Sequence, residues 1–279
     1  MLIMLPVSAV QEKIVIYSSD FSKDPGFTTN NPSRYYWDVT QEQYHFETEG
    51  GTNGYAFLPV ELGNDPFTLE YDINVSSIEK DGAVRFGLTS TDMDISKAAN
   101  ILGIFEYGQY GRLMSLQVID QNNHLYETDS LYSTYCGGQR DCETKLFEEN
   151  VTYHVEIRYN KQLNQADIKV TEKKSGGLAW GFYIPIGPNL HSLSRLAITT
   201  KGDYILDNTA VGYLDNIELY TYREVIPTVE TTPPTTVPTT VPTPTPTPTP
   251  TKSPVSLHLA WGALVVAAGL LGVYGKNRG

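Results

Sequence analysis

Cysteine and positive charge are both scarce in this chain of 279 residues. It has only two cysteines, and its 20 Lys and Arg are outnumbered by 32 Asp and Glu, which gives a formal net charge of −12. Such a surface repels phosphate backbones, so nucleic acid is not expected as a partner. The sequence also lacks a phosphate-binding loop, an HExxH zinc motif and any Ser/His/Asp set with recognisable flanking residues. These absences argue against an enzyme.

The two cysteines, Cys136 and Cys142, are separated by a short stretch that contains Gly137 and Gly138. In an exported domain this spacing predicts a disulfide, because the glycines let the chain turn tightly enough to bring the sulfurs together. A zinc site would need two more ligands, and neither His124 nor His154 has a recognisable spacing. Chain-entropy reasoning gives so small a loop about 2–3 kcal/mol of stabilisation, so the bridge shapes a loop rather than holding the fold.

The longest apolar run lies near the C-terminus, where residues 257–274 contain no Asp, Glu, Lys or Arg. A helix of this length spans roughly 27 Å, close to the thickness of a bilayer core. Trp261 and Tyr274 stand where ring side chains prefer the headgroup region, and Lys276 and Arg278 follow. We therefore predict a transmembrane helix over 255–274 and a cytoplasmic tail over 275–279. The N-terminal domain is then extracellular, on a single-pass protein of the cell membrane.

The N-terminus agrees with export. Residues 1–9 end in Val7, Ser8 and Ala9, the small-residue pattern that signal peptidase recognises. The apolar part is short and no cation precedes it, so we interpret 1–9 as the remnant of a signal peptide that starts upstream. The alternative is an ordinary buried first strand.

Residues 226–254 are dominated by Thr and Pro and cannot build a core. Proline in alternation favours an extended polyproline chain, which at about 3.1 Å per residue reaches up to about 90 Å. We interpret this disordered linker as a stalk, with its threonines as acceptors for O-glycans. Two N-glycan sequons lie upstream of the stalk, at Asn74 and Asn150.

Between the signal remnant and the stalk, residues 10–225 alternate apolar and polar side chains with period two. Residues 67–75 place Phe, Leu, Tyr, Ile and Val on one face, and 153–159 with 166–170 form a hairpin. Further strands are expected at 13–17, 35–38, 44–47, 55–58, 84–89, 102–107, 113–120, 180–184, 193–199 and 212–222. No helix is convincing, and 92–99 is the least strand-like stretch. The pattern predicts an all-β sandwich of two antiparallel sheets.

Three stretches carry a family likeness. Asp20 and Phe21 lead to the aromatic stretch 35–38, 67–72 is followed by 83–88, and 213–219 contains an Asp-Asn-Ile triplet. Together they resemble the concanavalin A-like lectin/glucanase (laminin G-like) jelly rolls over 20–222. This resemblance implies a two-sheet jelly roll that either recognises carbohydrate or, as in some members, cleaves β-glucans. The layout of sandwich, Thr/Pro stalk and C-terminal anchor resembles surface proteins of methanogenic archaea.

Members that cleave β-glucans carry Glu-x-Asp-x-x-Glu on one strand, and the nearest stretch here begins at Glu70 and Asp72. Val75 stands where the second Glu would be. A retaining mechanism needs two carboxyls about 5–5.5 Å apart, and half of that pair is missing. We therefore predict that Glu70 and Asp72 lie on the solvent side of a strand, and we expect no catalytic residue.

Calcium is the one cofactor that the sequence raises. Asp92, Asp94 and Ser96 offer alternate oxygen ligands in a predicted loop, although the Gly and the terminal Glu of an EF-hand are missing. A solvated loop without metal is the alternative, and the same holds for the turn at 120–123.

The sequence thus predicts a non-catalytic, membrane-anchored surface module that binds carbohydrate or mediates adhesion, with a glycan or a cell-envelope protein as partner. Two alternatives remain open: a structural envelope protein that contacts its neighbours, and a glycoside hydrolase acting on polysaccharide. The ligand-binding residues are not identified by any motif.

Overall fold

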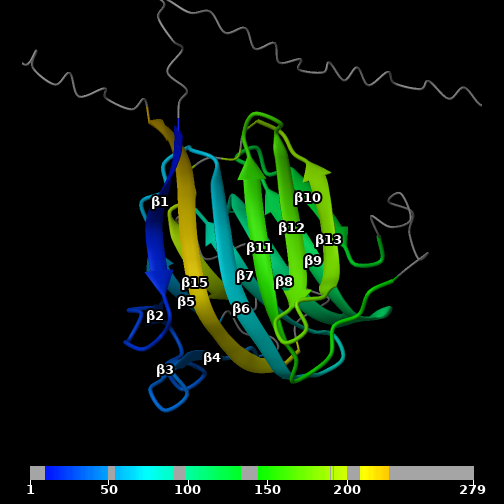
Figure 1. Ribbon diagram of the computed structural model, residues 1–279. Helices are drawn as coiled ribbons and strands as arrows, with labels where there is room; N and C mark the ends of the chain where they lie inside the picture. Colours follow the sequence, from blue (N-terminus) through cyan, green and yellow to red (C-terminus); the bar gives the residue numbers. More distant parts are fainter. Residues whose placement is uncertain are drawn as a thin grey trace, which may run out of the picture. The chain divides into compact units, whose positions relative to one another are not determined.

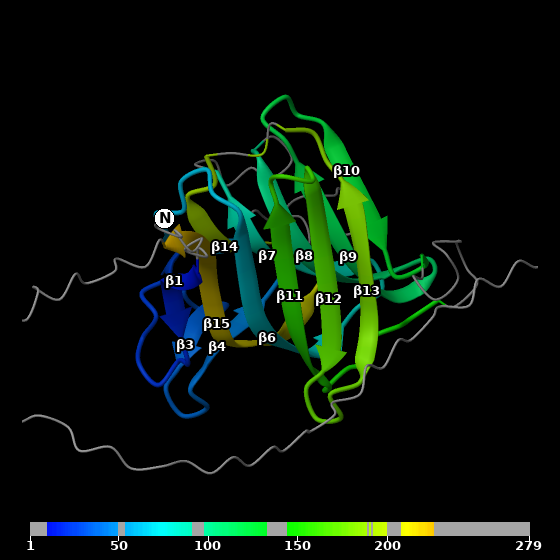
Figure 2. The same ribbon diagram turned by 45° about the horizontal axis from the view of Figure 1, so that its top comes forward.

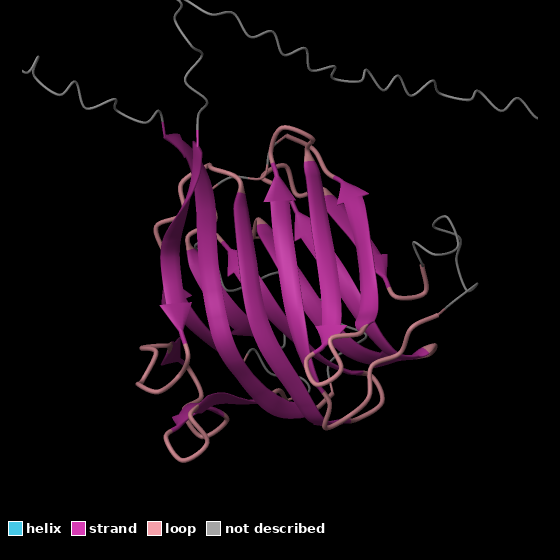
Figure 3. Cartoon of the chain, viewed as in Figure 1, coloured by secondary structure: helices cyan, strands magenta, loops and turns pink. Residues whose placement is uncertain are grey.

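The computed structural model describes residues 10–49, 54–90, 98–132, 144–188, 190, 192–199 and 208–225. Within these ranges the chain forms β-strands and no helix (Figure 3). No helix there is long and apolar enough to cross a bilayer. The predicted signal remnant (1–9), stalk (226–254), spanning segment (255–274) and tail (275–279) lie outside the described residues.

The strands form two antiparallel sheets that pack face to face (Figures 1 and 2). Sheet A has eight strands, seven of them in the order β13 (Leu178–Pro185), β12 (Gln165–Glu172), β11 (Thr152–Asn160), β6 (Phe67–Ile78), β15 (Ala210–Val225), β4 (Gln43–Glu47) and β3 (Tyr35–Asp38), with β1 (Val10–Ser19) also paired to β15. Sheet B has the order β10 (Leu125–Asp129), β9 (Gly111–Ile119), β8 (Asn100–Gly108), β7 (Gly82–Thr89), β14 (Arg195–Thr199), β5 (Tyr55–Pro59) and β2 (Thr28–Thr29).

The long strand β15 ties sheet A together. One of its edges pairs with β6, while its other edge pairs first with β4 and then with β1. The β1 ladder runs from Ser19 opposite Ile217 to Val10 opposite Val225, so the first and last strands of the domain lie side by side (Figure 1). A bulge near Asn216, whose φ is 48°, interrupts the pairing of β15 with β6.

The core lies between the sheets and follows from the predicted alternation. On β6 the inward residues are all buried: Phe67, Leu69, Tyr71, Ile73 and Val75. They meet the inward residues of sheet B, as where the Tyr71 ring packs edge-on against Phe86 at 4.7 Å between centroids. Removing such apolar surface from water is the main force that holds two sheets together.

One glycine makes this close packing possible. A Cβ at Gly103 on β8 would lie 2.3 Å from the Tyr71 hydroxyl, well inside contact distance. Sheet B therefore approaches β6 at a point where no side chain fits.

The structure confirms the all-β sandwich, the ten further strands and the β11–β12 hairpin, whose register pairs Tyr153 with Glu172 and Asn160 with Gln165. It adds two strands that the sequence did not indicate, β2 and β10. β2 has only two residues and β10 has an exposed Leu125, so neither carries a readable apolar alternation.

Candidate functional site

The outward-facing side chains of sheet A stand in rows, because residues paired across antiparallel strands share a face. One row joins Gly181, Lys169, Glu156, Glu70, Glu218 and Ser18 across β13, β12, β11, β6, β15 and β1. We call it the glutamate row. On one side of it, Tyr183, Asp167, Arg158, Thr68 and Tyr220 form the tyrosine row. On the other side lie Thr171, His154, Asp72 and Asp215.

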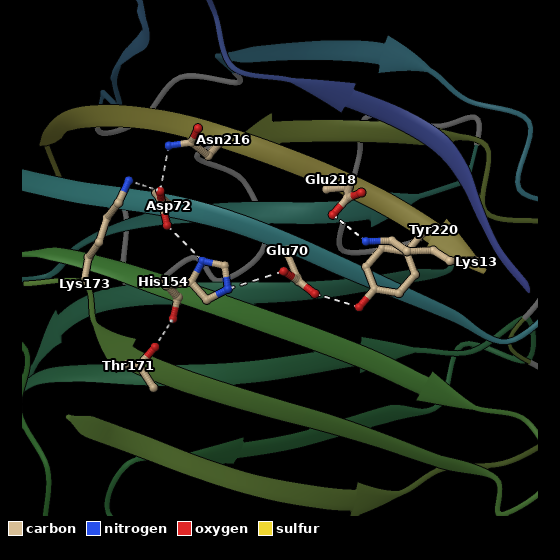
Figure 4. A network of polar contacts seen from close by, with 9 residues as sticks. All are labelled: Lys13, Glu70, Asp72, His154, Thr171, Lys173, Asn216, Glu218 and Tyr220. Carbon is tan, nitrogen blue, oxygen red and sulfur yellow. Dashed lines mark hydrogen bonds and ion pairs between the residues drawn. The ribbon is translucent and has the colours of Figure 1, made fainter. Parts of the chain in front are cut away.

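Asp72 is the centre of a polar network on this face (Figure 4). Its carboxylate lies 2.9 Å from Nδ1 of His154, accepts a hydrogen bond from Nδ2 of Asn216 at 2.8 Å, and pairs with Nζ of Lys173. The three partners come from β11, from the bulge of β15 and from the turn after β12. Glu70 and Asp72 face outward from β6, as predicted, but only 3% of Asp72 is exposed, because its hydrogen-bonding neighbours cover it.

These contacts set the charges at the centre of the network. Burial alone would raise the pKa of Asp72, but the hydrogen bonds from His154, Lys173 and Asn216 outweigh it and the pKa is lowered. The hydrogen bond to Asp72 raises the pKa of His154 against the opposing effect of burial. Nε2 of His154 also lies 3.5 Å from Glu70. The imidazole is thus held between two carboxylates.

The network continues along the glutamate row (Figure 4). The hydroxyl of Tyr220 donates to Glu70 at 2.6 Å, and Lys13 of β1 pairs with Glu218 at 2.7 Å. Nζ of Lys13 lies 3.8 Å from the centre of the Tyr220 ring. Strands β1, β15, β6 and β11, with the turn after β12, therefore supply a connected surface of donors and acceptors.

Three open hollows lie on this surface. One of about 550 Å³ is bordered by Glu70, Asp72, His154 and Lys173, together with Thr171, Glu172, Gly176, Asn216 and Glu218. A second of about 390 Å³ lies over Glu156, Arg158, Asp167, Lys169 and the rings of β13. A third of about 420 Å³ shares Asn216 and Glu218 with the first and extends to Ser18, Ser19 and Asp20. We call this set of hollows the outer strip.

An aromatic platform stands at one end of the outer strip. Tyr183 on β13 is 53% exposed, and its ring stacks on Phe182 with 5.7 Å between centroids and 13° between planes. Beside it, Nε of Arg158 pairs with Asp167 at 3.0 Å. An exposed ring next to fixed hydrogen-bonding groups is an arrangement suited to stacking one face of a polar ring compound while bonding its edge.

The outer face of sheet B is different, because several of its polar side chains are buried. Arg85, Asn100, Ser115 and Gln117 are each at most 5% exposed. Ser115 donates to Glu106 at 3.0 Å, and burial raises the pKa of Glu106 to about 7, with Arg85 opposing the shift. A carboxyl with such a pKa can exchange protons near neutrality. Glu106 therefore makes the outer face of sheet B a second place where proton transfer could occur, although the polar side chains around it are buried in this structure.

Several residues singled out by the sequence are not placed. Cys136 and Cys142 of the predicted disulfide, and Asp92, Asp94 and Ser96 of the predicted calcium loop, lie outside the described residues. Among the residues that are described, no group of three or more His, Cys, Asp or Glu could hold a metal ion. In the turn at 120–123, Asp120 accepts backbone hydrogen bonds from Asn122 and His124, which is the behaviour of a turn-forming side chain.

Both sequons are described, and they lie next to each other. Asn74 is half-buried within β6, where its Nδ2 donates to Thr152 at 3.2 Å and its Oδ1 accepts from Ser76 at 3.2 Å. Asn150 is exposed at a φ of 63° in the turn before β11. Thr152 is therefore both the third residue of one sequon and the partner of the other asparagine.

Sequence reasoning missed Lys173, Asn216 and Tyr183 as members of this surface. Lys173 and Asn216 reach Asp72 from positions 101 and 144 residues away in the chain. No spacing along the sequence could reveal such contacts. For Tyr183 the available signal was its place on a predicted strand, which does not distinguish an exposed ring from a buried one.

No family model matches the chain, and no curated protein matches it in sequence. Among solved structures it is similar to the CBM2 module of the evolved Dit of Lactobacillus casei BL23 phage J-1. The TM-score is 0.51 at 12% identity, over 76% of this chain and 97% of that one. It is also similar to a seed lectin of Lotus tetragonolobus, with a TM-score of 0.50 at 10% identity, over 76% of this chain and 100% of the lectin. The domain therefore has the concanavalin A-like lectin/glucanase jelly-roll fold, as the resemblance in the sequence implied.

Proposed function

We propose that this protein is a non-catalytic recognition module that binds uncharged carbohydrate through the outer strip of sheet A. The observation that carries the proposal is the combination of open hollows, fixed hydrogen-bonding side chains and the exposed Tyr183 ring on one face. The similar solved structures include a seed lectin and a CBM2 module, which favours a binding role for a domain of this fold.

The chemistry of the outer strip suits sugar hydroxyls. Each hydroxyl donates one hydrogen bond and accepts others, so neighbouring hydroxyls bind best where carboxylates and cationic donors alternate. Glu70 and Glu156 supply acceptors, while Lys169 and Lys173 supply donors. The acid-rich chain, with its formal net charge of −12, disfavours anionic glycans.

Catalysis on this face is disfavoured by the state of Asp72. A general acid must hold a proton near neutral pH, but three partners hold the Asp72 carboxylate in its charged form. A glycoside hydrolase remains the second candidate only through Glu106 of sheet B, whose pKa of about 7 suits proton transfer.

The proposal includes display at the cell surface. The predicted membrane segment, the Thr/Pro stalk and the acidic domain together favour a domain held away from the membrane, where several copies bind more strongly than one. A structural envelope protein shares this layout and differs in having protein partners.

A glycan array probed with the full-length chain tests the binding function. We expect retention on uncharged oligosaccharides and not on sulfated or uronic ones. Incubation with the same uncharged polysaccharides, followed by an assay for new reducing ends, tests turnover. If reducing ends are released by the wild type and not by Glu106→Gln, the protein is a hydrolase and not a binding module. If the array shows no binding and no reducing ends are released, both functions are contradicted.

A further inference from the structure

The three hollows of the outer strip adjoin one another. The first and third share Asn216 and Glu218, while the first and second border on neighbouring residues, because Glu70 of the first stands opposite Glu156 of the second in the register of β6 and β11. The strip thus runs from Tyr183 on β13 to Ser18 on β1, across six neighbouring strands. Five steps of about 4.8 Å between strands make it about 24 Å long, which is more than one sugar ring occupies.

The glutamate row runs along this whole length and has an arrangement that folding alone disfavours. Glu156, Glu70 and Glu218 stand directly opposite one another on three adjacent strands. Like charges in such cross-strand positions are destabilising. The repeat places a carboxylate acceptor on each of these three strands, at a regular interval, which suits a ligand built of repeating hydroxyl-bearing units.

The two ends of the row are open. Gly181 has no side chain and Ser18 has a small one, so neither terminal residue of the row closes the strip at its end. An end-binding site would need a wall that stops the chain. The open ends favour a ligand that continues beyond the strip in both directions.

The balance of charge indicates what kind of polymer fits. Seven carboxylates border the three hollows (Asp20, Glu70, Asp72, Glu156, Asp167, Glu172 and Glu218), against three Lys or Arg side chains (Arg158, Lys169 and Lys173). An anionic polymer would be repelled by this surplus. The interspersed Lys and Arg side chains already neutralise part of it, so a polycation is not required either.

We infer that the ligand is an uncharged polysaccharide that lies across the strands of sheet A, bound along its interior and not by a terminal sugar. In this arrangement one sugar stacks on Tyr183, and the following sugars lie over the glutamate row toward β1. The inference rests on the proposed function and specifies which carbohydrates the same surface takes.

Binding by the full-length chain to oligosaccharides of two and six units tests this inference by calorimetry. The uncharged probes are cello-, laminari-, manno- and chitin oligosaccharides; the charged probes are chitosan and oligogalacturonate of the same lengths. We expect at least one uncharged hexasaccharide to bind ten-fold or more tightly than its disaccharide. Equal affinities for both lengths would overturn the inference and leave the binding function intact.

Variants at one end of the strip and one strand short of the other end show whether a single ligand spans it. Tyr183→Ala on β13 and Glu218→Ala on β15 are about 19 Å apart, four strand spacings. We expect each to weaken hexasaccharide binding at least five-fold, whereas disaccharide binding responds to one of them at most. Tyr110→Ala is the matched control, because Tyr110 is 50% exposed but lies on the turn between β8 and β9 of sheet B.

The remaining outcomes are also decisive. Tightest binding of chitosan or of oligogalacturonate would overturn the assignment to uncharged polymers. An effect at one end alone on the hexasaccharide would restrict the site to a short ligand and contradict the spanning arrangement. No binding of any probe would remove the proposed function itself.

Discussion

Asp72 shows how a single side chain organises the outer face of sheet A. It collects hydrogen bonds from three segments that are distant in the sequence, and it is nearly fully buried although it faces outward. Replacing it would leave His154 and Lys173 beside each other without their shared counter-charge. Removing one partner of a buried charged group costs far more than removing an exposed pair.

We expect Asp72→Ala to lower the free energy of unfolding by about 2 kcal/mol, since its partners are partly exposed and regain water. Urea denaturation measures the change. Asp167→Ala is the control, because its pair with Arg158 is more exposed and should cost about 1 kcal/mol or less. Equal losses in the two variants would show that Asp72 has no special role.

The pH dependence of this loss has a defined sign. The lowered pKa of Asp72 means that its stabilisation is present above the unfolded value of about 3.9 and is lost as the pH falls through the folded value. The raised pKa of His154 means that its share is present below about 6.5 and is lost as the pH rises through the folded value. The difference between wild type and Asp72→Ala should therefore be larger at pH 5.5 than at pH 8.5.

The two sequon asparagines differ in their surroundings. Asn74 lies in a strand paired on both sides and its amide is already hydrogen-bonded, whereas Asn150 is exposed in a turn. We expect the glycan on Asn150. Intact-mass spectrometry of protein from its native host should lose one glycan in Asn150→Gln and none in Asn74→Gln. The opposite pattern would mean that modification precedes formation of β6.

At the scale of strands, the alternation of apolar and polar residues was enough to predict a strand wherever one face of that strand is buried. The predicted ranges 35–38 and 55–58 lie within a residue of β3 and β5, because aromatic and aliphatic side chains repeat with the period of the pleat. β2 and β10 were missed because they lie at the two edges of sheet B and have little apolar pattern. The order of the strands could not be predicted either. β6 pairs with β15 through residues that are far apart in the sequence, such as Leu69 opposite Leu219.

The close approach of β8 to β6 can be tested by a double-mutant cycle. Gly103→Ala should destabilise by about 1–3 kcal/mol, because the new Cβ would meet the Tyr71 hydroxyl. Tyr71→Phe removes that oxygen, which is buried and has no hydrogen-bond partner among the residues the structure describes. The cost of Gly103→Ala should therefore fall in the Tyr71→Phe background. Additive effects would place the clash elsewhere.

The outer face of sheet B carries its own pH dependence. The pKa of Glu106 is raised to about 7, so the folded state holds this proton where the unfolded state has released it. The free energy of unfolding therefore keeps its full value below the unfolded pKa of about 4.3 and falls as the pH rises from there through 7, by about 4 kcal/mol in all. We expect Glu106→Gln to gain stability over wild type between pH 5 and pH 8.5. Glu61→Gln, the same replacement at an exposed position, is the control for the substitution itself.

At the scale of the whole molecule, the sequence predicted the class of fold and left the working surface unidentified. Composition and alternation are properties of neighbouring residues, so they indicate an acidic all-β domain. The outer strip arises when six strands from across the chain come together, as where Ser18 meets Glu218. Such a surface can be identified only when the pairing register of the strands is known.

The predicted anchor is tested on the intact chain. Deletion of residues 255–279 should move the protein from the membrane fraction to the medium or the soluble fraction, because it removes the apolar segment that is predicted to hold the protein in the bilayer. Carbonate extraction and immunoblotting measure the shift. A full-length protein that is extracted by carbonate would contradict the spanning segment.

The pairing of the first and last strands has a mechanical consequence. Tension that enters the domain at Val225 acts along β15, which is hydrogen-bonded to β1 on one edge and to β6 on the other. Because the ladder bonds run perpendicular to the strands, such a pull loads many of them together in shear instead of opening them one after another. A domain joined to its support through this strand can therefore resist drag on a bound polymer without unravelling.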